Sequence, residues 1–208
     1  MPEPVMLGGV VVGGDVPPLV VAEMSGNHNG RLDRALDIVG AAAKAGARAI
    51  KIQTYAPEAM TLDISDGEFV ISDPDSPWYG RVLYDLYREA HTPWAWHRPI
   101  FERCRELGIL AFSTAFDATA VDLLESLDVP CHKIASFENT DLPLIRRAAS
   151  TGKPLIISTG MATIGEIDEA VRTARGAGCR DVILLKCTSA YPAPPEDSHL
   201  ATIPHMRD

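Results

Sequence analysis

Short apolar runs that end in polar residues recur along this chain. The runs are continuous and rich in β-branched residues, which is typical of strands buried on both faces of a parallel sheet. Segments with helical spacing separate most of them, so the pattern predicts an α/β fold built from strand–helix units. The six predicted strands are Leu19–Glu23, Ala49–Thr54, Ile109–Thr114, His132–Ser136, Leu155–Thr159 and Val182–Ser189.

Capping residues and glycines set the bounds of the predicted helices. Thr92 followed by Pro93 indicates an N-cap and a first helical turn, and Thr163 with Glu166 has the spacing of a capping box. The predicted helices cover residues 33–45, 82–89, 92–107, 117–127, 141–149 and 163–177.

The order of these elements favours a (β/α)8 barrel, of which the chain holds about six of the eight units. Residues 1–18 are predicted to form an N-terminal β-hairpin domain, and residues 19–208 a barrel domain. Because a closed barrel needs eight strands, the chain is either a complete open sheet or a barrel that is incomplete at its C-terminal end. Residues 54–91 form a long connection that contains several aromatic residues, which favours a functional loop over disorder.

Composition narrows the function classes. The 208 residues carry a net charge of −9, with 46% hydrophobic and 23% charged residues, and no stripe of Lys and Arg stands out. We therefore expect no nucleic-acid partner. The N-terminus lacks the pattern of a signal peptide, and no run is long enough to span a membrane, so we expect a cytoplasmic protein. The four cysteines form no C-x-x-C pair, and three of them sit in or beside apolar runs, so reduced buried thiols are expected.

Two lysines within apolar strands are the strongest chemical signal. Lys51 and Gln53 share one face of their strand, and Lys133 repeats the pattern further along the chain. A buried lysine needs an anionic partner, which is either a carboxylate such as Glu23 on the neighbouring strand or a bound ligand. Two such lysines favour an anionic substrate, although a Schiff-base lysine stays an alternative. Hydroxyl groups at the strand ends add to this signal: Ser113, Thr114, Ser136, Ser158, Thr159, Thr188 and Ser189.

These residues resemble the N-terminal barrel of the sialic acid synthase family, which condenses phosphoenolpyruvate with an amino sugar. Further segments, among them residues 80–87 and 92–97, are most similar to the pseudaminic acid synthase branch. The matching segments are 22–30, 51–54, 112–117, 133–138, 158–161 and 187–192.

The resemblance implies roles for individual residues. Glu23 and Glu138 would be catalytic and lie near the reacting centre, with Glu138 also near a divalent metal, Mn²⁺ or Mg²⁺. Gln53 and Tyr191 would face the sugar. Phosphoenolpyruvate would be held by Lys51, Thr114, Lys133, Ser136, Ser158 and Ser189.

Other features of the family are missing from the sequence. The two histidine ligands of the metal follow a Ser-Asp-His motif that would lie beyond Asp208, so no metal ligand is assigned here. The C-terminal antifreeze-like domain of the family is likewise not expected within these 208 residues. The full-length protein is expected to be a homodimer, as in the family.

The sequence thus predicts a transferase that makes pseudaminic acid from phosphoenolpyruvate and a 2,4-diacetamido-2,4,6-trideoxy hexose, with release of phosphate. Three alternatives stay open: an N-acetylneuraminate or legionaminate synthase, a Schiff-base aldolase, and an inactive barrel fragment that only binds a ligand or a partner.

Overall fold

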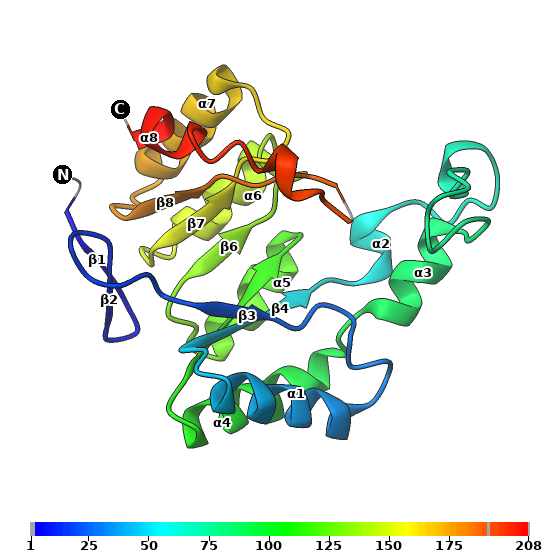
Figure 1. The fold of residues 1–208 in the computed structure, drawn as a ribbon, viewed down its shortest axis with the longest axis horizontal. Helices are drawn as coiled ribbons and strands as arrows, with labels where there is room; N and C mark the ends of the chain where they lie inside the picture. Colours follow the sequence, from blue (N-terminus) through cyan, green and yellow to red (C-terminus); the bar gives the residue numbers. More distant parts are fainter. Residues whose placement is uncertain (1–2, 191, 208) are drawn as a thin grey trace. The chain divides into compact units, whose positions relative to one another are not determined.

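The computed structural model describes residues 3–190 and 192–207, which form two compact parts (Figure 1). One part comprises residues 19–120. The other comprises residues 3–18 together with residues 121–207. Each part holds three of the predicted strands.

Three parallel strands form the sheet of the part that spans residues 19–120. They are β3 (Val21–Glu23), β4 (Ala49–Thr54) and β5 (Leu110–Ala115), and β4 pairs with both neighbours. Helices α1 (Leu32–Lys44) and α4 (Trp94–Glu106) lie side by side in this part (Figure 1). Ile50 and Ile52 of β4 are fully buried, whereas Lys51 and Gln53 between and after them are partly exposed. The predicted alternation along this strand is therefore confirmed.

The long connection between β4 and α4 is folded. It contains the short helix α2 (Pro57–Met60), the 3₁₀ helix η1 (Gly67–Phe69), an antiparallel bridge between Val70 and Val82, and α3 (Leu83–Ala90). Its base is closed by aromatic contacts, because the ring of Tyr55 lies edge-on to those of Tyr87 and Phe116. The predicted helix over residues 82–89 is confirmed within one residue at each end.

The other part contains the N-terminal hairpin and the later strands. β1 (Val5–Leu7) and β2 (Val10–Val12) are antiparallel. The parallel strands are β6 (His132–Ile134), β7 (Leu155–Ser158) and β8 (Val182–Leu185). The helices are α5 (Ala118–Ser126), which spans the division between the parts, α6 (Leu142–Ala149), α7 (Ile164–Gly176) and α8 (Thr202–Arg207), with the 3₁₀ helix η2 (Pro195–Ser198) before α8.

Strand β8 is shorter than predicted. The sequence predicts a strand from Val182 to Ser189, but pairing with β7 stops at Leu185. The side chains of Lys186, Cys187 and Thr188 lie in the loop that follows, where the Lys186 ammonium donates to Thr188 Oγ1 and to the Asp197 carbonyl. The segment leaves the sheet where the Lys186 ammonium and the Thr188 hydroxyl both donate to the Asp197 carbonyl of η2.

Helices α6 and α7 each begin at a side-chain cap, and that of α7 is the predicted capping box. Asp141 accepts a hydrogen bond from the Leu144 amide, and Thr163 and Glu166 form the reciprocal capping box. The prediction for Thr92 is wrong: α4 begins at Trp94, and Thr92 makes no capping bond. The Thr92 hydroxyl instead lies 3.3 Å from His28 Nε2.

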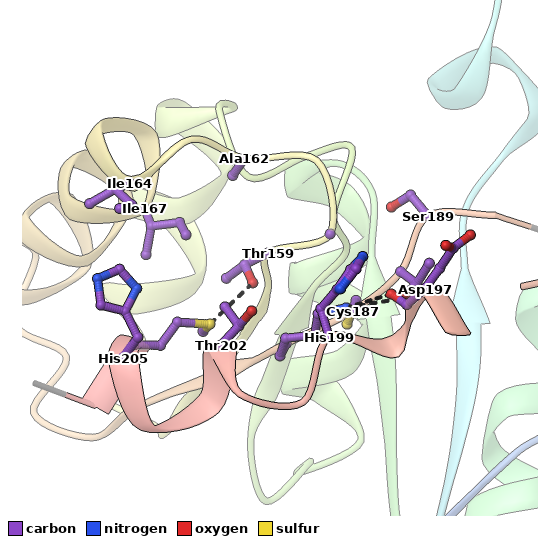
Figure 2. Close-up of a pocket in the computed structure, with 14 residues that line it drawn as sticks. Thr159, Ala162, Ile164, Ile167, Cys187, Ser189, Asp197, His199, Thr202 and His205 are labelled. Atoms are coloured by element: carbon purple, nitrogen blue, oxygen red, sulfur yellow. Dashed lines mark hydrogen bonds between the residues drawn. The ribbon is translucent and has the colours of Figure 1, made fainter. Parts of the chain in front are cut away.

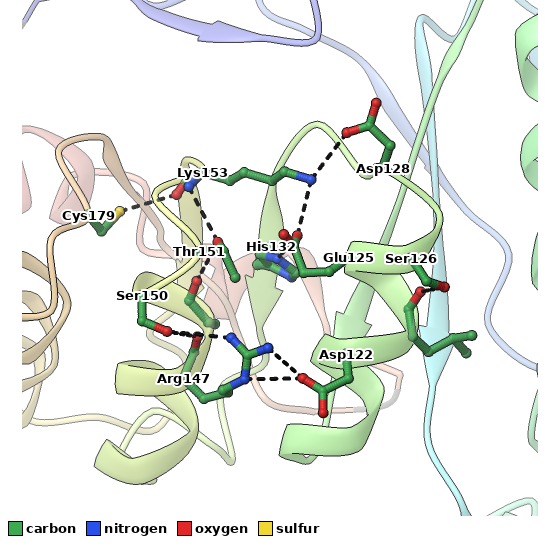
Figure 3. A network of polar contacts seen from close by, with 12 residues as sticks. Asp122, Glu125, Ser126, Asp128, His132, Arg147, Ser150, Thr151, Lys153 and Cys179 are labelled. Carbon is green, nitrogen blue, oxygen red and sulfur yellow. Dashed lines mark hydrogen bonds and ion pairs between the residues drawn. The ribbon is translucent and has the colours of Figure 1, made fainter.

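Charged residues before β6 and β7 form a network at the amino ends of these strands (Figure 3). Glu125 accepts from both His132 Nε2, at 2.8 Å, and the Lys153 ammonium, at 3.1 Å. Burial lowers the pKa of His132, and the hydrogen bond and charge of Glu125 oppose this shift. The amino ends of barrel strands usually serve stability, so we assign this network to the structure of the part and not to a site.

The predicted α/β class is confirmed. All six predicted strands occur among the described residues, they are parallel within each part, and the hairpin precedes them. Across the same residues, the longest helices are too short or too polar to cross a membrane.

Candidate active site

Four of the predicted residues lie at the carboxyl ends of β3, β4 and β5. We call them the Lys51 cluster: Glu23, Lys51, Gln53 and Thr114. The strand register pairs Glu23 with Lys51 and Gln53 with Thr114. The Lys51 ammonium forms an ion pair with the Glu23 carboxylate and donates to Thr114 Oγ1 at 3.2 Å. The Lys51 side chain is 18% exposed, so its charge is partly desolvated and remains within reach of solvent.

The Glu23 carboxylate is held from a second side. Ser25 donates both its backbone N–H and its hydroxyl to Glu23 Oε1, each at 3.1 Å. Ser25 has a φ of +48°, a conformation that residues other than glycine rarely adopt. Because Ser25 occupies one carboxylate oxygen and Lys51 the other, the orientation of Glu23 is fixed before any ligand binds.

A buried polar chain lies directly behind the Lys51 cluster. Thr54 Oγ1 lies 2.7 Å from His97 Nε2 and 2.6 Å from Ser113 Oγ, and all three residues are fully buried. Burial lowers the pKa of His97 to about 4, so the imidazole is neutral at neutral pH. Its Nδ1 faces the Pro93 carbonyl at 3.3 Å, so we place the proton on Nδ1 and the Thr54 hydroxyl as the donor to Nε2.

His28 ties the turn after β3 to the start of α4. Its Nδ1 accepts from the Gly30 amide at 3.2 Å, so Nε2 carries the proton and faces Thr92 Oγ1. The Trp96 ring lies edge-on to His28 with ring centres 5.4 Å apart. His28 is fully buried, and burial lowers its pKa. It is therefore a neutral structural group of the turn.

A second set of predicted residues lies in and after the strands of the other part. We call it the Lys133 cluster: Lys133, Ser136, Ser158 and Ser189. Lys133 is only 4% exposed, and its ammonium donates to Ser158 Oγ at 2.5 Å and to the Ile134 carbonyl at 2.6 Å. Ser158 Oγ also accepts from the Cys187 thiol at 3.3 Å. A lysine this deeply buried is kept in an apolar strand only where its charge has a use or a partner.

Gly160 brings the serines of this cluster close together. Its amide donates to Ser136 Oγ at 3.1 Å. A Cβ at this position would collide with Ser189 Oγ and would approach Ser136 Oγ to 3.0 Å. A larger residue at this position would displace the serine hydroxyls, because their oxygens occupy the space of a side chain.

Glu138 and Asn139 have buried oxygen atoms with no hydrogen-bond partner among the described residues. They are Glu138 Oε2 and Asn139 Oδ1. Burial raises the pKa of Glu138, and the charge of Lys133 opposes that shift. Asn139 donates its Nδ2 to the Ser158 carbonyl at 3.1 Å, so it supports the same strand end that carries Ser158. A bound ligand with hydrogen-bond donors could satisfy these two buried oxygen atoms.

The described residues do not fit a divalent metal by themselves. Nowhere in residues 3–190 and 192–207 do three or more His, Cys, Asp or Glu side chains converge as a metal-binding group. Glu138 offers one buried carboxylate oxygen, which is too few for Mg²⁺ or Mn²⁺. The metal predicted from the resemblance would need ligands that this part of the chain does not supply.

A cavity of about 510 Å³ adjoins the Lys133 cluster (Figure 2). Thr159 and Gly160 after β7, and Cys187 and Ser189 after β8, line one side. Residues of α7 and α8 line the other, and Thr159 Oγ1 lies 3.8 Å from Met206 Sδ. The volume is within the range of small-molecule sites.

The structure therefore groups the predicted residues in two clusters, one in each part. Glu23 and Gln53 join Lys51 and Thr114, whereas Ser136, Ser158 and Ser189 join Lys133, with Glu138 in the adjoining loop. Tyr191 lies outside the described residues. The sequence analysis missed the polar chain behind the Lys51 cluster and Asn139; the hydroxyls of Thr54 and Ser113, at fully buried strand positions, are the signal that could have shown the chain.

Comparison with known proteins identifies close relatives. Residues 38–208 match the NeuB family. The chain is 44% identical over 187 residues to a protein of Helicobacter pylori named pseudaminic acid synthase, which covers 90% of this chain and 54% of the relative. A pseudaminic acid synthase of Campylobacter jejuni is 42% identical over 194 residues, or 93% of this chain and 56% of the relative. The chain thus spans about half the length of these two relatives.

The structural comparison agrees. The crystal structure of an N-acetylneuraminic acid synthetase from Leptospira borgpetersenii, in complex with citrate, superposes with a TM-score of 0.86 at 30% sequence identity. The match covers 99% of this chain and 66% of that chain. Two comparisons that use different information thus lead to the same group of proteins.

Proposed function

Because this chain belongs to the NeuB family and has its barrel-type fold, we propose that it is the phosphoenolpyruvate-binding portion of a nonulosonic acid synthase. The proposed reaction joins phosphoenolpyruvate to an acetamido sugar. The product is a nine-carbon nonulosonic acid, and inorganic phosphate is released.

The observation that carries the proposal is the buried Lys133 ammonium beside Ser158. In an acidic chain this cation lies in the middle of β6, is only 4% exposed, and donates to the Ser158 hydroxyl. Cations and hydroxyl donors are the groups that bind phosphate and carboxylate. We assign Lys133, Ser136, Ser158 and Ser189 to the anionic groups of phosphoenolpyruvate.

The Lys51 cluster, within its own part, offers groups of the same kind. Lys51 and Thr114 offer an ammonium and a hydroxyl, already 3.2 Å apart, to an anionic group of the ligand. Gln53, next to Thr114 in the strand register, is assigned to the sugar together with Tyr191. The carboxylate of Glu23, fixed by Ser25, lies beside these donors and is assigned to the reacting groups.

The chemistry that these residues would promote is a condensation followed by hydration. C3 of phosphoenolpyruvate forms a bond to the aldehyde carbon of the open-chain sugar, and the aldehyde oxygen takes up a proton. Water then adds at C2, and the C2–O bond breaks so that inorganic phosphate leaves. The lysines stabilise the negative charge that moves onto the leaving phosphate.

Glu138 is assigned to proton transfer. Its raised pKa makes the protonated form more available than for an ordinary surface glutamate, and one of its oxygens has no partner among the described residues. A carboxyl group with these properties can give a proton to the aldehyde oxygen or take one from the attacking water. The divalent cation, Mn²⁺ or Mg²⁺, stays a proposal for the longer protein, with ligands from outside the described residues.

The sugar proposed is a 2,4-diacetamido-2,4,6-trideoxy hexose, so that the product is pseudaminic acid. The support is the sequence identity of 44% and 42% to two proteins that are named pseudaminic acid synthase. A phosphate-release assay tests it with the full-length protein, Mn²⁺, phosphoenolpyruvate and a panel of amino sugars. We expect release with the trideoxy hexose and little with N-acetylmannosamine. Release with N-acetylmannosamine alone would make the protein an N-acetylneuraminate synthase, and no release with any sugar would end the catalytic proposal.

The 208-residue chain needs its own experiment. We expect titration calorimetry to show phosphoenolpyruvate binding that Lys133→Met abolishes. Binding without turnover would support a ligand-binding fragment, whereas trapping of a lysine adduct by borohydride would support a Schiff-base aldolase.

A homodimer, proposed for the full-length protein, is checked by light scattering.

A further inference from the structure

A buried polar chain is formed by His97, Thr54 and Ser113, none of which belongs to the Lys51 or the Lys133 cluster. All three residues are fully buried, and the chain runs from helix α4 to strands β4 and β5. Ser113 Oγ also lies 3.0 Å from the Ile52 carbonyl, so the chain reaches the backbone of β4 one residue before Gln53. Burying three polar side chains is unfavourable unless each is hydrogen-bonded, and apolar residues of the same shape would fill this space more simply.

The position of the chain relates it to the Lys51 cluster. Thr54 follows Gln53 on β4, and Ser113 precedes Thr114 on β5. Because side chains alternate along a strand, Gln53 and Thr114 point to one face while Thr54 and Ser113 point to the other. The bond between Thr54 and Ser113 therefore links the two strands immediately behind the pair Gln53 and Thr114.

The start of helix α4 joins this chain to the turn that carries Glu23. Thr92 faces His28 at 3.3 Å, and Trp96 lies against the same imidazole. His97, one residue after Trp96, holds Thr54 at 2.7 Å. Residues 92–97 thus contact, on one side, the turn after β3 and, on the other, the ends of β4 and β5.

We propose that His97 is a positioning residue for the Lys51 cluster: through Thr54 and Ser113 it fixes the spacing of β4 and β5 at the point where they present Gln53 and Thr114. It touches no ligand itself. The inference rests on the proposed function, because it assumes that the Lys51 cluster binds phosphoenolpyruvate. A lost bond in this chain moves a hydroxyl by a fraction of an ångström, which is enough to weaken a binding contact.

The test separates positioning from stability. Thr54→Val keeps the shape of the side chain and removes its bonds to His97 and to Ser113, whereas His97→Leu removes the ring. Cys104→Ala is the matched control, because Cys104 is fully buried on the same helix and contacts neither strand hydroxyl by a hydrogen bond. We expect titration calorimetry to show phosphoenolpyruvate affinity at least about fivefold lower for Thr54→Val and His97→Leu. We expect His97→Gln, which keeps an amide acceptor, to retain affinity within about twofold of the unmodified chain.

Two results would overturn the inference. One is unchanged affinity in Thr54→Val, and the other is an equal loss in Cys104→Ala at the same loss of thermal stability. A second readout needs no ligand: the methyl resonance of Thr114 in nuclear magnetic resonance spectra should shift in Thr54→Val and His97→Leu and stay in place in Cys104→Ala. If the unmodified chain binds no phosphoenolpyruvate, the proposed function fails for this chain, and the Thr114 resonance alone decides whether His97 positions the strand ends.

Discussion

Lys51 and Glu23, on the neighbouring strands β4 and β3, form an ion pair at the carboxyl ends of their strands. The sequence left open whether Lys51 pairs with a protein carboxylate or with a ligand, and in this structure it pairs with the carboxylate. An anion that binds to Lys51 must therefore share the ammonium with Glu23. The ion pair therefore lowers the affinity of the Lys51 cluster for anions, and it also fixes the position of the Lys51 ammonium.

Replacing Glu23 should strengthen anion binding. We expect Glu23→Gln to bind phosphoenolpyruvate about three to ten times more tightly, because the ligand no longer competes with a fixed carboxylate for Lys51. Titration calorimetry measures this change. Asp33→Asn is the control, since it removes one surface carboxylate, paired with Arg31, and changes the net charge equally. Weaker binding in Glu23→Gln would show that Glu23 assists the ligand directly.

Gly160 should not tolerate a methyl group. In Gly160→Ala the new Cβ meets Ser189 Oγ and Ser136 Oγ, and we expect a loss of about 1–3 kcal/mol in the free energy of unfolding from overpacking. Phosphoenolpyruvate binding should fall with it, because both serines must move. Gly40→Ala in α1 is the opposite case: nothing lies within 4 Å of its new Cβ, and we expect a gain of about 0.5–1 kcal/mol. Urea unfolding of both variants checks the pair.

Glu138 should destabilise the chain at neutral pH. Burial raises its pKa in the folded state, so the folded state binds the proton more tightly than the unfolded state does. The free energy of unfolding therefore falls as pH rises from the unfolded pKa to the raised folded pKa. We expect Glu138→Gln to be more stable than the unmodified chain at pH 7 and equally stable below pH 4, where the carboxyl is protonated in both states. A variant that is less stable at pH 7 would contradict this assignment.

His97 should make the chain sensitive to acid. Its pKa falls from 6.5 to about 4 on folding, so the unfolded state binds the proton more tightly between these values. Stability should therefore fall as pH drops below 6.5, by up to roughly 3 kcal/mol at pH 4. Unfolding at several pH values measures the slope. His97→Gln should reduce that slope, while His28 and His132, whose pKa values burial also lowers, keep part of it.

Cys187 should be the first cysteine to react with iodoacetamide. It is the one cysteine that is not buried, and burial raises the pKa of Cys104 and Cys131 to about 12 and raises that of Cys179. Because its thiol donates to Ser158 Oγ, we expect phosphoenolpyruvate to slow the reaction. Mass spectrometry of digested protein locates the modified residue. Labelling of Cys104 at a comparable rate would mean that α4 opens easily.

The sequence allowed a good prediction of the strands and of both lysines. The strands are short runs rich in apolar residues, and a lysine within such a run is conspicuous, so Lys51 and Lys133 could be found from the sequence alone. Alternation along β4 also gave the face that Lys51 and Gln53 share. The length of β8 was overestimated because the polar residues after Leu185 bond to η2, which the local pattern does not show.

Long-range polar bonds could not be predicted. Thr92 has the local pattern of a helix cap, but its hydroxyl faces His28, 64 residues earlier. Thr54 bonds to His97 and Ser113 across 43 and 59 residues. Side-chain periodicity indicates which face a residue occupies, and it contains no information about the partner that a hydroxyl finds there.

The connection between β4 and α4 leaves and returns at nearly the same place. Tyr55 donates to the Tyr87 carbonyl at 3.4 Å, and burial raises the pKa of its phenol to about 12, so the hydroxyl stays protonated. The bridge between Val70 and Val82 closes the segment again further out. Insertions or deletions between residues 71 and 81 would therefore cost little loop-closure entropy and would leave β4 and α4 where they are. A change in the length or sequence of that segment would leave unaltered the strands that carry Lys51 and Thr114.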